Sequence, residues 1–156
     1  MTRPLAALLA LALWLGAAAL FAAAVAPAAF AVLPSRSLAG ALVGRVLPVI
    51  FWSGIAAGLL AAVLSWLDRE RPDALPRAIA ALATAAACAV AQLVFGPRIQ
   101  ALRASIGGSL DALPAGDARR VAFGRLHGFS VMLMGVGMLA AVAAVALTVL
   151  ALRTRR

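Results

Sequence analysis

The chain has 156 residues, of which 65% are hydrophobic and 12% are charged, and its net charge is +9. A soluble domain is about 45–50% apolar and about 25% charged, so this composition excludes a water-covered globule and predicts a protein whose solvent is lipid. Every basic residue is an arginine lying between or beside apolar segments, as in membrane proteins. We therefore expect a lipid bilayer, and no nucleic acid, as partner.

The first apolar segment, residues 5–33, follows Arg3 and Pro4 and contains no charge. A signal peptide shows the same order of features, but its apolar region is only about 7–15 residues long. Because about 20 helical residues cross the ~30 Å hydrocarbon core, we predict a retained membrane span. The alanine-, glycine- and arginine-rich composition is typical of GC-rich bacterial genomes and predicts the cell inner membrane.

Residues 37–67 form the second predicted span, with Ser37 as its N-cap, and residues 76–103 form the third after the charged loop DRERPDALP. Thr84, Cys88 and Gln92 are spaced four apart on the third span, so they share a face that we expect inside the bundle. Glycines four apart in GALVG, GIAAG and GRLHG predict faces where helices approach closely.

Residues 117–153 form the fourth predicted span, which carries the single histidine. No segment alternates apolar and polar residues as a strand would, and backbone groups in lipid must be satisfied within the segment. The predicted fold class is an all-α integral membrane protein. It is an antiparallel bundle of four transmembrane helices with proline-kinked helices at one face, forming a single domain over residues 1–156.

Polar residues and prolines collect at one face of this predicted bundle. Prolines at this level free backbone carbonyls, and arginine binds phosphate or carboxylate groups. We interpret this end as a vestibule for an anionic solute, a lipid headgroup or a soft-metal complex. Its candidate binding residues are Arg45, Gln92, Pro97, Arg98, Arg125, His127 and Ser130. The alternative, that arginines only anchor helix ends in headgroups, is favoured for Arg36, Arg103, Arg119 and Arg120. We expect the opposite face to carry no such collection.

The sequence leaves two further classes of function open, a metal or haem protein and a structural subunit. His127, Met134 and Met138 share a helical stripe, and imidazole with thioether suits haem or copper; these residues are weak metal candidates, and no cofactor is expected. The spans hold no carboxylate pair, and Ser130 with His127 lacks an orienting third group, so we predict no catalytic residue and no enzyme. A structural subunit that packs its glycine faces on a membrane-protein partner or a second copy is the other alternative.

The arginines divide about equally between the two membrane faces, so the positive-inside rule does not by itself orient the chain. If Arg45, Arg98 and Arg125 are retained for function and discounted, both termini are predicted to be cytoplasmic.

Four motifs occur in order along the spans: LWLGAAALFAAAVAPAAF, LAGALVGRVLPVIFW, FGPRIQALR and FGRLHGFS. From about Leu13 to Leu139 the chain thereby resembles the transmembrane-protein-205-like family, defined by the domain of unknown function 4149. This resemblance implies a four-helix integral membrane protein without an established biochemical activity. It adds weight to Pro97, Arg98, Arg125 and His127 as a shared set. An animal relative is associated with resistance to platinum drugs, but the loop between Arg103 and Asp117 is shorter here.

Overall fold

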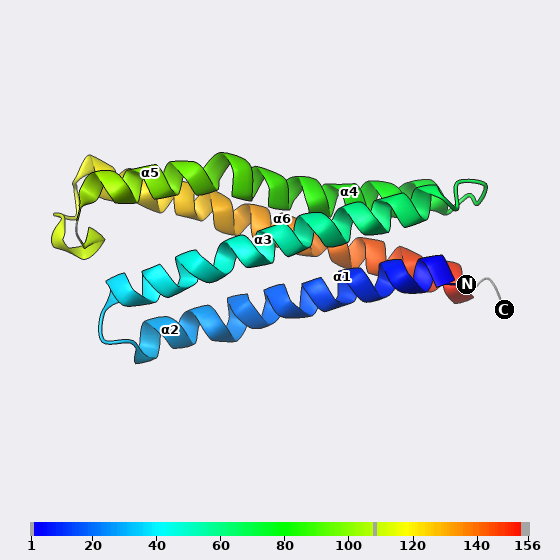
Figure 1. Ribbon diagram of the computed structural model, residues 1–156, viewed down its shortest axis with the longest axis horizontal. Helices are drawn as coiled ribbons and strands as arrows, with labels where there is room; N and C mark the ends of the chain where they lie inside the picture. Colours follow the sequence, from blue (N-terminus) through cyan, green and yellow to red (C-terminus); the bar gives the residue numbers. More distant parts are fainter. Residues whose placement is uncertain (1, 108, 154–156) are drawn as a thin grey trace.

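The computed structural model describes residues 2–107 and 109–153 of the chain. Four long apolar helices run antiparallel (Figure 1) and confirm the predicted four-helix membrane bundle. In chain order they are α1 (Thr2–Leu20), the π-helical turn η1 (Phe21–Val25) and α2 (Ala26–Val32); α3 (Arg36–Trp66); α4 (Ala74–Val90), the π-helical turn η2 (Ala91–Phe95) and α5 (Gly96–Ile106); and α6 (Ala118–Arg153). A short 3-10 turn, η3 (Leu110–Ala112), precedes α6.

The second helix begins at Arg36, one residue earlier than predicted. Its N-cap is Ser35, whose hydroxyl accepts a hydrogen bond from the backbone N–H of Leu38 at 3.2 Å, and not Ser37. Ser35 has the extended backbone conformation that an N-cap requires. The prediction placed the cap two residues too late because both serines of SRS are suitable caps by residue type alone.

Buried positions follow one another in steps of three and four along a seam of α1, α3, α4 and α6. This spacing is the a and d register of helices that pack at small crossing angles. Most side chains at these positions are small, which lets helices approach closely in lipid. The buried seams are Pro4, Ala7, Leu11, Trp14, Ala18 and Phe21 on the first helix; Phe51, Gly54, Gly58, Ala61 and Ser65 on α3; Ala74, Arg77, Ala81, Thr84, Cys88 and Ala91 on the third; and Ser130, Met134, Gly137, Ala141, Ala144, Thr148 and Ala151 on α6.

Trp14 and Cys88 occupy the centre of the bundle. The indole Nε1–H of Trp14 donates to the backbone carbonyl of Ile50 at 2.9 Å. A Cβ atom on Gly54 would lie 2.6 Å from both this nitrogen and the Cys88 sulfur. Gly54 therefore lacks a side chain because the space is filled from two neighbouring helices, and it packs inside the chain, where no partner reaches it.

The two helical hairpins repeat the same break. A five-residue π-helical turn, Phe21–Val25, precedes Pro27, and the turn Ala91–Phe95 precedes Pro97, 70 residues after Pro27. In each turn a backbone N–H bonds five residues back, from Ala26 to Phe21 and from Gly96 to Ala91. A separation of 70 residues is a whole number of heptads, so heptad packing by itself would bury equivalent positions in both spans. It would not place a π-helical turn and a proline at equivalent positions. The first and third spans thus share the same backbone irregularity.

The bundle opens at the end away from the termini. There α2 packs on α3 and α5 packs on α6, and the two pairs diverge (Figure 1). The end that holds the termini is closed by α1, α3, α4 and α6.

The closed end was expected to carry no collection of polar residues within its helices, and this expectation is wrong. Arg77 is only 1% exposed. Its Nε lies 3.1 Å from Asp73 Oδ2, and its Nη2 lies 3.9 Å from Asp68 Oδ2. Arg71 and Arg3 pair with the same two carboxylates from the outside. The loop DRERPDALP therefore folds back as an ion-pair network that joins α1, α3 and α4.

Candidate functional site

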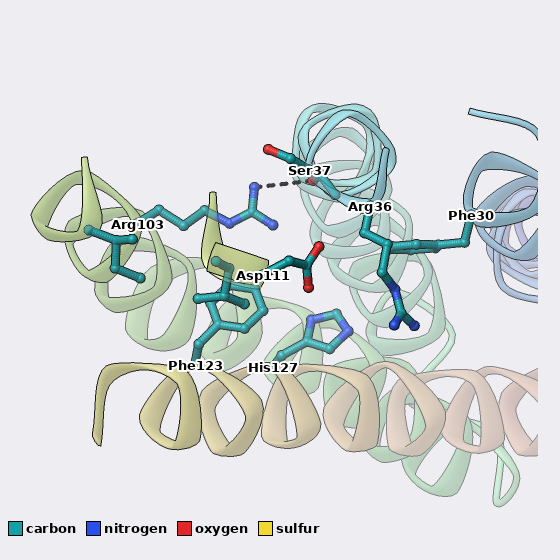
Figure 2. Close-up of a pocket in the computed structure, with 10 residues that line it drawn as sticks. Phe30, Arg36, Ser37, Arg103, Asp111, Phe123 and His127 are labelled. Atoms are coloured by element: carbon teal, nitrogen blue, oxygen red, sulfur yellow. Dashed lines mark hydrogen bonds between the residues drawn. The ribbon is translucent and has the colours of Figure 1, made fainter. Parts of the chain in front are cut away.

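An outer cavity of about 270 Å³ lies at the open end of the bundle, between the two diverging helix pairs. Its polar lining comes from three different parts of the chain: Arg36 and Ser37 at the start of α3, Arg103 on α5 with Asp111 on η3, and His127 on α6. Apolar side chains complete the wall: Phe30, Ile106, Leu110 and Phe123. Figure 2 shows the Asp111 carboxylate and the His127 ring in the same space, with Arg103 and Arg36 on its two sides.

Arg103 spans the gap between α5 and α3. Its Nη1 donates to the backbone carbonyl of Gly40 at 3.1 Å, the bond drawn dashed in Figure 2. A Cβ atom on Gly40 would lie 3.1 Å from Nη2, and one on Gly44 would lie 3.3 Å from Nη1. The glycines of GALVG, predicted to let two helices approach, therefore make room for a guanidinium group.

The Arg103 guanidinium also lies over an aromatic column. Its central carbon is 5.1 Å from the centroid of the Phe123 ring, a cation–π distance. The Phe123 and His127 rings are stacked, with centroids 5.9 Å apart and planes 7° apart. These contacts leave most of the five guanidinium N–H donors unused. Among the residues that the structure describes, no ion pair includes Arg103.

An inner cavity of about 60 Å³ continues the outer one toward the bundle centre. Arg103, Phe123 and His127 line both cavities, so the two cavities adjoin at this column. Gln92 and Ser130 line the inner cavity beside apolar residues such as Phe51. Among the described residues, the side chains of Gln92, His127 and Ser130 have no hydrogen-bond partner. Unpaired polar groups are costly in a membrane, so this cavity suits a ligand or water that pairs with them.

The predicted site residues separate into two groups. Gln92, His127 and Ser130 come together at the inner cavity as the sequence indicated. Arg45, Arg98 and Arg125 are exposed on the outside of their helices and line neither cavity, and Pro97 is exposed beside them. The candidate charge therefore comes from Arg103 and Arg36, both of which the sequence analysis interpreted as headgroup anchors.

The π-helical turn η2 explains why Arg103 was missed. A continued spacing of three and four from Cys88 and Ala91 would bring Phe95, Arg98 and Leu102 inside. The turn inserts one residue, so the inner face continues through Gln92, Gly96, Ile99 and Arg103 instead. One feature of the sequence could have indicated the π-helical turn. An apolar segment followed by a proline occurs twice, as VAP at residues 25–27 and as FGP at residues 95–97.

The weak metal candidates do not meet in one place. His127 lies at the cavities, whereas Met134 is buried on the α6 seam and lines neither cavity. In the described part of the chain, no three His, Cys, Asp or Glu side chains are grouped as a metal site. The geometry gives no support to haem or copper ligation by His127 with Met134 or Met138.

Comparison with known proteins gives one result. A family model described as domain of unknown function (DUF4149) matches residues 9–107. The match covers the first three helices, including the Pro97–Arg98 motif and Arg103, and ends before the FGRLHGFS motif of α6. No curated protein and no solved structure matches the chain.

Proposed function

Since the chain belongs to the family of the domain of unknown function 4149, whose description names no activity, we propose that it is a membrane protein that binds an anionic group in the outer cavity. Arg103 is the main ligand, Arg36 adds positive charge, and His127 with Ser130 and Gln92 offers hydrogen bonds further in. The anionic group belongs to a lipid headgroup or to a solute that enters from the membrane face.

The observation that carries this proposal is the state of Arg103. Its guanidinium is half-buried among apolar and aromatic groups, donates one hydrogen bond to the Gly40 carbonyl, and takes part in none of the ion pairs of the described residues. Arginine in such surroundings is a strong, directional donor to phosphate or carboxylate oxygens. A bound anion would neutralise it and accept from its remaining N–H groups.

Dodecyl phosphate, titrated calorimetrically into the protein in dodecyl maltoside, tests the proposal. We expect wild-type protein to bind one equivalent and Arg103→Gln to bind about 10- to 100-fold more weakly, because hydrogen bonds to charged groups contribute about 1.5–3 kcal/mol. Arg98→Gln is the matched control, since Arg98 lies on the same helix but lines neither cavity. Equal weakening by both changes would mean general surface attraction and would contradict a site at Arg103.

Passage of the bound group across the membrane is the second candidate. Repeated hairpins with interrupted helices are features of transporters, whose sites lie near the membrane midplane. Here the cavities lie at one end, and the other half of the bundle is packed through its seam of small residues. This arrangement favours binding over passage through a single chain. A partner-binding subunit remains a prediction, but Gly54 and Gly58 are used inside the chain, whereas Gly124 and Gly128 are exposed.

We place the protein in the cell inner membrane with both termini in the cytoplasm. Arg36 and Arg103 belong to the proposed site, which leaves five arginines at that end against seven at the end with the termini. The positive-inside rule then favours cytoplasmic termini. We expect a fluorescent protein fused to the C-terminus to fluoresce in a bacterial host and an alkaline phosphatase fusion there to be inactive. The reverse pair of results would invert the orientation.

A further inference from the structure

We propose that the ligand of the outer cavity is a zwitterion, the phosphoethanolamine headgroup of a phospholipid. This inference rests on the proposed function, because Arg103 and Arg36 would hold the phosphate. It adds a second recognition element, Asp111, for the ammonium group, and it assigns the inner cavity to the glycerol ester region of the same lipid.

Asp111 is the residue that a site for a simple anion does not explain. It is the one acidic residue that lines the outer cavity, and it shares that cavity with Arg36 and Arg103. Among the described residues it takes part in none of the ion pairs, unlike Asp117, which Arg119 holds at 2.9 Å. A carboxylate in a site for an anion lowers affinity by repulsion, so its presence points to a positive group on the ligand.

The position of Asp111 is set by the local backbone. It lies in the 3-10 turn η3, capped by Ser109, whose hydroxyl accepts from the Asp111 N–H at 3.3 Å. Leu110 in this turn and Ile106 at the end of α5 line the same cavity. The carboxylate points into the space between the two arginines (Figure 2). A carboxylate between two guanidinium groups gives the cavity both signs of charge, which fits a ligand whose phosphate and ammonium are separated by two carbons.

The inner cavity matches the next part of a phospholipid. It adjoins the outer cavity at Arg103, Phe123 and His127. It offers the amide of Gln92 and the hydroxyl of Ser130 among apolar groups such as Leu47 and Ile99. Ester carbonyls accept hydrogen bonds and carry apolar chains, so the glycerol region of a lipid would pair these donors. The outer cavity lies beside the ends of α2 and α5, where a bilayer places its headgroups.

A primary ammonium fits better than a quaternary one. Phosphocholine carries the same charges as phosphoethanolamine, but its trimethylated nitrogen has no N–H to donate to a carboxylate. Phosphatidylglycerol keeps the phosphate and has no positive group. A set of dioleoyl lipids that differ only in these headgroups therefore separates the contributions of Arg103 and Asp111.

The experiment is native mass spectrometry of the delipidated protein in detergent, titrated with dioleoyl phosphatidylethanolamine, phosphatidylglycerol and phosphatidylcholine. We expect wild-type protein to bind phosphatidylethanolamine about fivefold or more tightly than the other two. Asp111→Asn should abolish this preference, because it weakens phosphatidylethanolamine and relieves the repulsion of phosphatidylglycerol, whereas Arg103→Gln should weaken all three lipids. Glu70→Gln, in the loop at the closed end, is the control and should change nothing.

The outcomes separate this inference from the proposed function. If phosphatidylglycerol binds as tightly as phosphatidylethanolamine, or if Asp111→Asn leaves the preference intact, the zwitterion is refuted while the anion site stands. If Arg103→Gln affects neither these lipids nor dodecyl phosphate, the anion site itself fails. Glycerophosphoethanolamine, which has the headgroup but no acyl chain, should compete poorly; competition equal to that of the intact lipid would overturn the lipid assignment in favour of a soluble phosphodiester.

Discussion

Replacing Arg77 by methionine is expected to lower the free energy of unfolding by about 3 kcal/mol. The Arg77 side chain is 1% exposed, and its Nε–H donates to the backbone carbonyl of Asp73 at 3.0 Å. Removing one partner of a buried ion pair typically costs about 3–5 kcal/mol, because the remaining charge stays buried. We expect the lower end, since Asp73 and Asp68 keep part of their exposure and retain contacts with Arg71 and Arg3.

The matched control for this change is Arg69→Met in the loop that precedes α4. Arg69 is exposed, so its replacement should shift stability by less than about 0.5 kcal/mol. Titration with sodium dodecyl sulfate in mixed micelles, followed by tryptophan fluorescence, measures both. The double change Arg77→Met with Asp73→Ala should cost less than the sum of the single changes, since it removes both members of the pair. Equal stability of the Arg77 and Arg69 variants would contradict the buried network.

Gly58→Ala should destabilise the bundle by about 3 kcal/mol, although it adds only one methyl group. A Cβ atom at Gly58 would lie 2.7 Å from the backbone oxygen of Ala81 and 2.8 Å from the backbone nitrogen of Ala85. Backbone atoms of α4 do not rotate away as a side chain does, so α3 and α4 must separate along their contact. Overpacking of this kind costs about 1–3 kcal/mol, and the contact with backbone on two sides places Gly58 at the upper end.

Gly128→Ala controls for the same substitution elsewhere in the bundle. Gly128 lies on α6 with no atom within 4 Å of its added Cβ, so its change should be nearly neutral. The sodium dodecyl sulfate concentration at the midpoint of unfolding in mixed micelles should be lower for Gly58→Ala and unchanged for Gly128→Ala. A Gly58 variant as stable as the Gly128 variant would show that α3 and α4 are not packed at this distance.

The third helix shows how far the site could be predicted. Thr84, Cys88 and Gln92 were expected on an inward face, and their four-residue spacing was enough to place them; Thr84 and Cys88 are fully buried, and Gln92 lines the inner cavity. Arg98 was chosen over Arg103 because it adjoins Pro97. The proline is indeed where the helix changes, but the π-helical turn before it shifts the inward face by one residue. Sequence spacing assumes a constant helical period and cannot follow such a shift.

The position of Asp111 in the site could not be predicted from the sequence, for a different reason. Asp111 belongs to a loop whose path depends on where α5 ends and α6 begins, and neither helix period nor hydropathy extends into it. Arg77 was likewise hidden, because an arginine beside a charged loop has the same local sequence whether it faces water or folds inward onto Asp68 and Asp73.

By itself, the sequence determined the class of protein, because apolar content and the length of four uninterrupted segments leave lipid as the only solvent and helices as the only element. It also predicted that Gln92, His127 and Ser130 lie at the same end of the bundle. Only the tertiary structure decided which residues face one another. A helix in lipid is apolar on all sides, so hydropathy does not mark the inner face; the seam of small residues, the π-helical turns and the folded loops select Arg103, Asp111 and Arg77 from among many similar charges.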